Sequence, residues 1–355
     1  MDFGTWISND PHRVAEEATF AEEHGFRHGW VWDLPLDSGE LFVCLTLAAA
    51  ATRTLTLGTW IASASYRIPA VTVSAIATIH AIAPGRVILG IGSGSVGRAV
   101  MGLPAIKFTK LRQHLTTVHD LLHEGEALSW IDGLQRTIRF AKHGRQLLKL
   151  QPRIPLYIAA AAPKITALAG ALGDGVFNAG PVTPQAVSAF LQQVTAGARN
   201  IGRTLGHFPC VWETAVCILR PGETLESSRV IESTGHFVKL VLGVCAAGLF
   251  PEEIAPPEVR PLCQAYREHL TQRAALEIEP HLAFGEDHHF VRPEERRFIT
   301  PEAIRWCTLT GTREELIDRI RALEEAGLTE IALSPSPNGV RDAMTEVSRE
   351  LIGKV

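Results

Sequence analysis

"RVILGIGSGSVGRA", residues 86–99, decides between two α/β architectures. An apolar run leads into a loop in which Gly92, Gly94 and Gly97 match the pattern G-x-G-x-x-G. In a dinucleotide-binding fold this pattern follows the first strand, and an acidic residue stands about twenty residues further on, at a strand tip. Here the loop follows the fourth predicted strand, and Asp120 lies inside a predicted helix. The context therefore argues against a dinucleotide site, and a tight turn without a ligand is the plain alternative.

Short apolar strands alternate with helical segments on both sides of this loop. The pattern predicts strands over residues 3–7, 27–32, 55–60, 87–91, 154–159, 176–178, 211–219 and 330–334. Eight strand–helix units predict a (β/α)8 TIM barrel, an α/β fold, as one domain over residues 1–355. The segment 221–305 is too long for one crossover. We expect it to be a helical insertion between strands seven and eight that covers the active site or contacts another subunit.

Composition excludes several classes of protein. The formal net charge of -4 argues against a nucleic-acid partner, and no apolar run is long enough to span a membrane. No signal peptide is visible, and the six cysteines contain no C-x-x-C pair. We therefore expect a cytoplasmic protein with reduced thiols and no metal site. His119 and His123 stand one helical turn apart without a third ligand, so we expect a solvated pair.

Four segments in series resemble one known family: residues 21–33 (AEEHGFRHGWVWD), 52–95, 154–177 and 309–335. They are similar to the bacterial luciferase-like oxidoreductases, which use a flavin or a deazaflavin. The glycine loop and the stretch IAAAAPKITALAG (158–170) resemble the deazaflavin-using branch, similar to methylenetetrahydromethanopterin reductase. The resemblance implies the same barrel that the strand pattern predicts.

The resemblance also implies where the cofactor would bind. In the family, the cofactor ring rests on a non-prolyl cis peptide in a bulge that ends the third strand. This bond maps onto Trp60–Ile61, or one bond earlier, with Ala62 following. The ring's pyrimidine edge would meet the glycine loop, at Gly92, Ser93, Gly94 and Ser95.

A run of alanines is the expected phosphate site. Free N–H groups at a helix start attract phosphate, and Pro163 is well suited to open a helix. The residues expected to contact the phosphate are Ala159, Ala160, Ala161 and Ala162, with Asn178, Ala179 and Gly180 beside them. The alternative is an ordinary helix start made of small residues.

Asp33 is the candidate catalytic residue, because it ends the second strand, where catalytic groups of barrels gather. Relatives often follow this aspartate with a histidine that acts as acid or base. Leu34 stands there in this chain, so that mechanism does not transfer. The alternative for Asp33 is a turn cap. Glu213 receives little catalytic weight, because it falls early in the predicted strand 211–219.

The resemblance implies an oxidoreductase that transfers a hydride between coenzyme F420 and a small organic substrate. The substrate would lie beneath loops from strands one, two and seven. The alternative is an FMN-dependent monooxygenase that uses reduced flavin and O2. A barrel that binds a flavin without catalysis is a third possibility. The resemblance also implies a homodimer, whereas the residues do not indicate which substrate is used.

Overall fold

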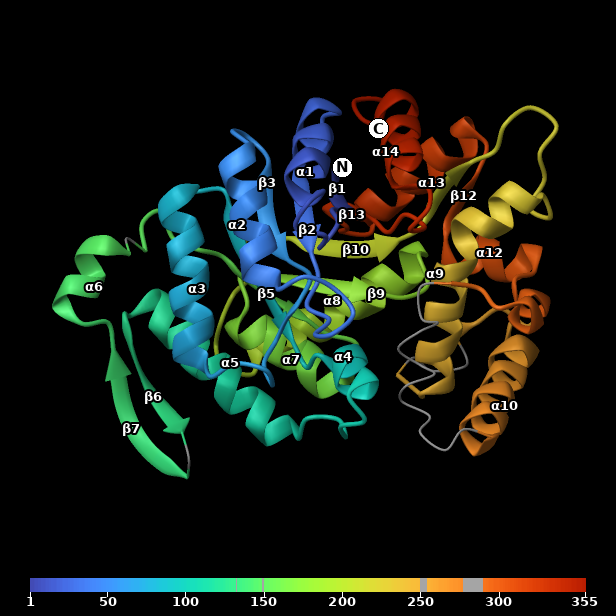
Figure 1. The fold of residues 1–355 in the computed structure, drawn as a ribbon. Helices are drawn as coiled ribbons and strands as arrows, with labels where there is room; N and C mark the ends of the chain where they lie inside the picture. The colour runs from blue at the N-terminus through green and yellow to red at the C-terminus, as the bar shows by residue number, and fades with distance from the viewer. Residues whose placement is uncertain (132, 149, 250–253, 277–289) are drawn as a thin grey trace.

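The computed structural model describes residues 1–131, 133–148, 150–249, 254–276 and 290–355 (Figure 1). Eight parallel strands form its central barrel. They are β1 (Asp2–Trp6), β2 (His28–Val31), β3 (Thr56–Thr59), β5 (Val87–Gly92), β8 (Leu156–Ala159), β9 (Gly175–Ala179), β10 (Cys210–Thr214) and β13 (Glu330–Leu333). Pairing of Leu57 with Val87 and of Gly58 with Ile88 closes the cylinder between β3 and β5. The predicted TIM barrel is confirmed.

A ring of helices covers the outside of this barrel (Figure 1). Its members are α1 (Val14–Glu23), α2 (Leu41–Ala51), α3 (Pro69–Ile82), α5 (Phe108–His123), α7 (Pro163–Leu172), α8 (Pro184–Arg199), α13 (Arg313–Glu325) and α14 (Val340–Glu350). Local sequence starts two of them. The Thr183 hydroxyl accepts a hydrogen bond from the Ala186 N–H, and Thr312 forms a capping box with Glu315. None of the helices in the described part of the chain is long and apolar enough to cross a membrane.

Large side chains fill the barrel interior. Trp30 and Phe177 meet edge to face there, with ring centroids 5.0 Å apart. The same buried cluster also contains Ile88, Tyr157, Val211 and Ala332. This packed layer closes the lower part of the cylinder, so only the residues above it, at the carboxyl ends of the strands, can meet a ligand.

The seventh predicted strand is wrong in its extent. β10 ends at Thr214, and β11 (Val216–Ile218) leaves the barrel to pair with β12 (Leu309–Gly311) in a separate two-stranded sheet. The apolar pattern runs unbroken from residue 211 to 219 and therefore does not reveal where the partner strand changes. As a result Glu213 lies next to the carboxyl end of its strand, and the prediction that it sits near the amino end is wrong.

The insertion that follows packs around a buried cluster of its own. It comprises α9 (Ser228–Ala246), α10 (Arg260–Leu276), the 3-10 helix η2 (Pro293–Phe298) and α12 (Pro301–Cys307). The buried aromatic side chains of this cluster are Phe237, Tyr266, Phe298 and Trp306. Figure 1 shows the insertion at one side of the barrel, with α9 nearest to it.

The sequence pattern also missed an antiparallel hairpin, β6 (Glu126–Ile131) with β7 (Leu134–Arg139), followed by the short helix α6 (Lys142–Leu147). It projects from the barrel beyond α5 (Figure 1). Its strands are mostly solvated, and the large apolar side chains Leu128, Trp130 and Leu134 are exposed, so the sequence does not show the apolar alternation of a half-buried strand.

Candidate active site

The mouth of the barrel has a floor made of inward-facing side chains. Trp6, Trp60 and Ala159 pack against the interior cluster from above. Ala179 and Glu213 face the same way, because each lies two residues beyond an interior residue of its strand. The floor is therefore aromatic and small-residue in character, with one carboxyl group in it.

The chain forms a bulge where it leaves β3. The peptide bond between Trp60 and Ile61 is cis, at the bond that the resemblance implied. The strand then resumes as β4 (Ala62–Ser63), which pairs with the end of β5. The indole of Trp60 packs against Phe177, with ring centroids 4.2 Å apart. Trp60 and Ile61 remain partly exposed, so this bulge forms part of the surface that a ligand would meet.

The glycine loop packs directly against the bulge. A Cβ on Gly92 would lie 2.3 Å from Cδ1 of Ile61, and one on Gly94 would lie 1.9 Å from Oγ of Ser63. Gly94 also adopts a left-handed φ of 65°. Ser93 is half-buried beside it, whereas Ser95 is exposed and begins α4 (Ser95–Val100). Glycine therefore lets the side chains of Ile61 and Ser63 lie directly against the backbone of this loop, and at Gly94 it also permits the left-handed φ.

The alanine run and the end of β9 lie together, as predicted. The Nδ2 amide of Asn178 donates to the Ala160 carbonyl at 2.9 Å. Its Oδ1 atom is buried and has no hydrogen-bond partner among the described residues. Ala162 caps α7 without a side-chain hydrogen bond, and the Gly180 carbonyl accepts from the Trp212 indole at 3.1 Å. In this corner of the mouth, the Oδ1 atom of Asn178 and the backbone N–H groups at the start of α7 thus lack side-chain partners among the described residues, and the alanine side chains beside them are no larger than a methyl group.

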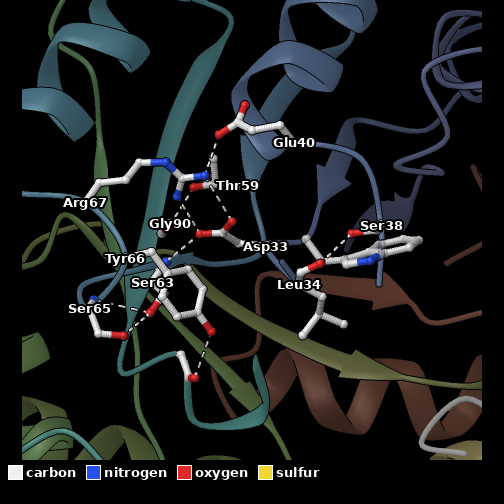
Figure 2. Close-up of polar contacts among 12 residues, drawn as sticks. Asp33, Leu34, Ser38, Glu40, Thr59, Ser63, Ser65, Tyr66, Arg67 and Gly90 are labelled. Carbon is white, nitrogen blue, oxygen red and sulfur yellow. Dashed lines mark hydrogen bonds and ion pairs between the residues drawn. The ribbon is translucent and has the colours of Figure 1, made fainter. Parts of the chain in front are cut away.

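Asp33 is held by groups of the protein itself (Figure 2). Arg67 binds both of its carboxylate oxygens, at 2.8 Å and 3.2 Å, and the Ser63 N–H donates to it at 3.0 Å. Glu40 pairs with the same guanidinium. These bonds tie the end of β2 to the bulge after β3. A direct catalytic contact from Asp33 stays a prediction, and its neighbour Leu34 offers no titratable group.

Glu213 is a residue that the sequence analysis undervalued. Its Oε2 atom accepts a hydrogen bond from the Trp60 indole at 3.1 Å, while Oε1 is buried without a partner among the described residues. Burial raises the pKa of Glu213 to about 7, although the hydrogen bond from Trp60 acts in the opposite direction. The signal in the sequence was a single acid inside the apolar run VWETAV, residues 211–216.

A cavity of about 610 Å³ opens beside this floor. Its wall comes from the loops after β1, β2 and β13 and from α9 of the insertion. Trp6, Trp32 and Phe290 make it aromatic, and Asn9 and His236 add polar groups. The Nε2 atom of His236 lies 3.1 Å from the Ser334 carbonyl oxygen. The sequence does not point to His236, because nothing in the irregular segment 221–305 indicates which of its residues reach the mouth.

Comparison with known proteins agrees with this geometry. A family model described as luciferase-like monooxygenase matches residues 2–330. The chain belongs to the luciferase-like monooxygenase family. The expected family is confirmed, and the protein is an oxidoreductase of this family.

Individual members of the luciferase-like family are similar over different lengths. The 5,10-methylenetetrahydromethanopterin reductase of Archaeoglobus fulgidus is 27% identical over 94% of this chain and 93% of its own. An F420-dependent glucose-6-phosphate dehydrogenase of Beutenbergia cavernae is 32% identical over 56% of this chain and 58% of its own. The solved structure of the coenzyme F420-dependent tetrahydromethanopterin reductase of Methanopyrus kandleri superposes with a TM-score of 0.75. It is 23% identical and covers 99% of this chain and 98% of its own, which supports the fold.

Proposed function

We propose that this protein is an F420-dependent oxidoreductase that transfers a hydride between the deazaflavin and a small organic substrate. The observation that carries the proposal is the floor of the mouth, where the bulge at Trp60–Ala62 faces small residues of the glycine loop and of β8 and β9. A flat ring can lie against such a floor. The names of the relatives from Archaeoglobus fulgidus and Beutenbergia cavernae support a reductase or dehydrogenase activity.

The residues at the mouth fit the cofactor. Trp60, Ile61 and Ala62 would support the ring, and residues 92–95 would meet its edge. Residues 159–162 and 178–180 would surround the phosphate, and the backbone N–H groups at the start of α7, which no side chain caps, would be the hydrogen-bond donors to it. When bound, coenzyme F420 supplies a centre that donates or accepts a hydride.

The chain's own residues would orient the cofactor ring and the substrate, and would accept or donate the substrate's proton. Glu213 holds the Trp60 indole in the floor through the hydrogen bond to its Nε1. His236 lies in the wall of the 610 Å³ cavity, where the substrate would bind. A hydroxyl substrate loses a proton as it loses a hydride, and a carbonyl substrate gains both. We assign that proton to His236, since Leu34 cannot carry it.

An anaerobic titration tests the cofactor. The purified protein is mixed with oxidised coenzyme F420, with FMN or with buffer, and binding is followed by absorbance and fluorescence. We expect saturable binding of F420 and not of FMN. Bleaching of bound F420 is then screened with a panel of small alcohols. Binding of FMN alone would favour the monooxygenase instead.

A matched variant tests His236. We expect His236→Gln to slow bleaching of bound F420 by about 10²-fold or more, while the affinity for F420 stays unchanged, because the side chain lines the substrate cavity and not the cofactor floor. Unchanged bleaching rates in His236→Gln would remove this residue from the mechanism. No bleaching with any substrate, despite F420 binding, would favour a non-catalytic carrier.

We also propose a homodimer in the cytoplasm. α2 and α3 pack side by side, contain no lysine, arginine, aspartate or glutamate, and expose Val43, Leu47, Val71 and Ile82. A second copy related by a twofold axis would cover this apolar face. All six cysteines are buried free thiols, which suits a reducing compartment.

The oligomeric state is measured by light scattering after gel filtration. Val43→Glu with Val71→Glu should give monomers, because two charges would be buried at the centre of the contact. Ile201→Glu, which changes an exposed apolar residue elsewhere, serves as the control. A monomeric wild-type protein would exclude the dimer.

A further inference from the structure

A second cavity, of about 830 Å³, lies outside the barrel mouth. It is bounded by the loop after β4, the segment that joins α4 to α5, the face of α5 and the β6–β7 hairpin. None of its described lining residues lines the 610 Å³ cavity. It is therefore separate from the site at which the substrate is proposed to bind.

The wall of this cavity is cationic. Arg67, Arg98, Lys107 and Lys110 line it, and none of its described lining residues is an aspartate or a glutamate. The guanidinium of Arg67 already forms ion pairs with Asp33 and Glu40, as Figure 2 shows. Three cationic side chains thus remain around one hollow, in a chain whose formal net charge is -4.

Two buried polar atoms in the same wall have no partner among the described residues. His114 on α5 is 8% exposed and Ser129 on β6 is 1% exposed. Both line the cavity, and neither Nε2 of His114 nor Oγ of Ser129 forms a hydrogen bond with any residue that the structure describes. Burial lowers the pKa of His114 to about 4, so the imidazole is neutral at pH 7 and can donate one hydrogen bond. Buried polar groups in native proteins are usually satisfied, which indicates a polar ligand here.

We propose that this cavity binds a small anion with several carboxylate or phosphate groups. Lys107, Lys110 and Arg98 would pair with the charges, while His114 and Ser129 would donate hydrogen bonds to an inner oxygen. The site lies close to the glycine loop, because the Tyr66 hydroxyl on its wall donates to the Gly94 carbonyl at 3.3 Å. The anion can therefore be a free metabolite or the charged side chain of a cofactor bound at the mouth.

Calorimetry at low salt tests the proposal with citrate and with pyrophosphate as probes. We expect one saturable site in the wild-type protein and about tenfold weaker binding in the double variant Lys107→Gln, Lys110→Gln, with a further loss as salt is added. Both lysines are exposed, so the variant should fold. Lys142→Gln with Lys354→Gln, two exposed lysines outside the cavity, is the matched control and should bind like the wild type. Absent binding, or equal binding by the two double variants, would overturn the site.

A second arm separates the two sources of the anion and does not depend on catalysis. The calorimetric titration is repeated with the protein saturated with F420. Loss of the citrate site, together with weaker F420 binding by the Lys107, Lys110 variant, would assign the cavity to the cofactor's side chain. An unchanged citrate site would assign it to a free anion. If F420 does not bind at all, the proposed function fails, while the apoprotein titration still decides the anion site.

Discussion

The buried carboxyl of Glu213 should make the free energy of unfolding depend on pH, and replacing Glu213 by glutamine should remove that contribution. The wild-type carboxyl has a pKa of about 7 in the folded protein against a usual value of 4.5, and it is fully buried. A difference of this size corresponds to about 3 kcal/mol between the two protonation states. The folded protein holds the proton more tightly than the unfolded chain does. The wild type is therefore most stable below pH 4.5 with respect to this group, and it loses that stability as the pH rises to about 7 and above.

Urea unfolding at a series of pH values measures this effect. From pH 4.5 to pH 8, the free energy of unfolding of the wild type should fall by about 3 kcal/mol relative to Glu213→Gln. Glu226→Gln, an exposed glutamate in the insertion, should run parallel to the wild type. If the difference between the wild type and Glu213→Gln does not change with pH, burial does not raise the pKa of Glu213, and the buried position assigned to this carboxyl in the floor is wrong.

Two further predictions concern packing and the bulge. Gly170→Ala should destabilise the protein by about 1–3 kcal/mol in urea unfolding, because the new Cβ would lie 1.9 Å from the Val194 carbonyl oxygen between α7 and α8. An unchanged unfolding midpoint would mean that α7 and α8 can move apart to accept the methyl group without loss of stability. Asp33→Asn should cost about 1–3 kcal/mol, since Arg67 loses its bidentate partner while Ser63 keeps an acceptor. It should also weaken F420 binding in the fluorescence titration, and full affinity would show that the bulge does not depend on Asp33.

Much of the fold follows from local signals in the sequence. Strand residues that are buried on both faces read as continuous apolar runs, and proline or threonine marks several helix starts, as at Thr183 and Thr312. The number of strand–helix units can be read from such patterns, and eight units predict the barrel. The cis bond was implied only by the resemblance to the luciferase-like family, at Trp60–Ile61 or one bond earlier, and the structure has it at Trp60–Ile61.

Only the tertiary structure decided which distant residues share a surface. Glu213 became part of the floor because β10 ends at Thr214, and β11 (Val216–Ile218) pairs instead with β12, almost a hundred positions further along the chain. His236 reaches the mouth because the insertion packs on its own core and turns α9 toward β13. Local sequence determines hydrogen bonding along a helix and the alternation of a strand. It does not determine which partner a strand finds, since that depends on packing energies summed over residues far apart in the chain.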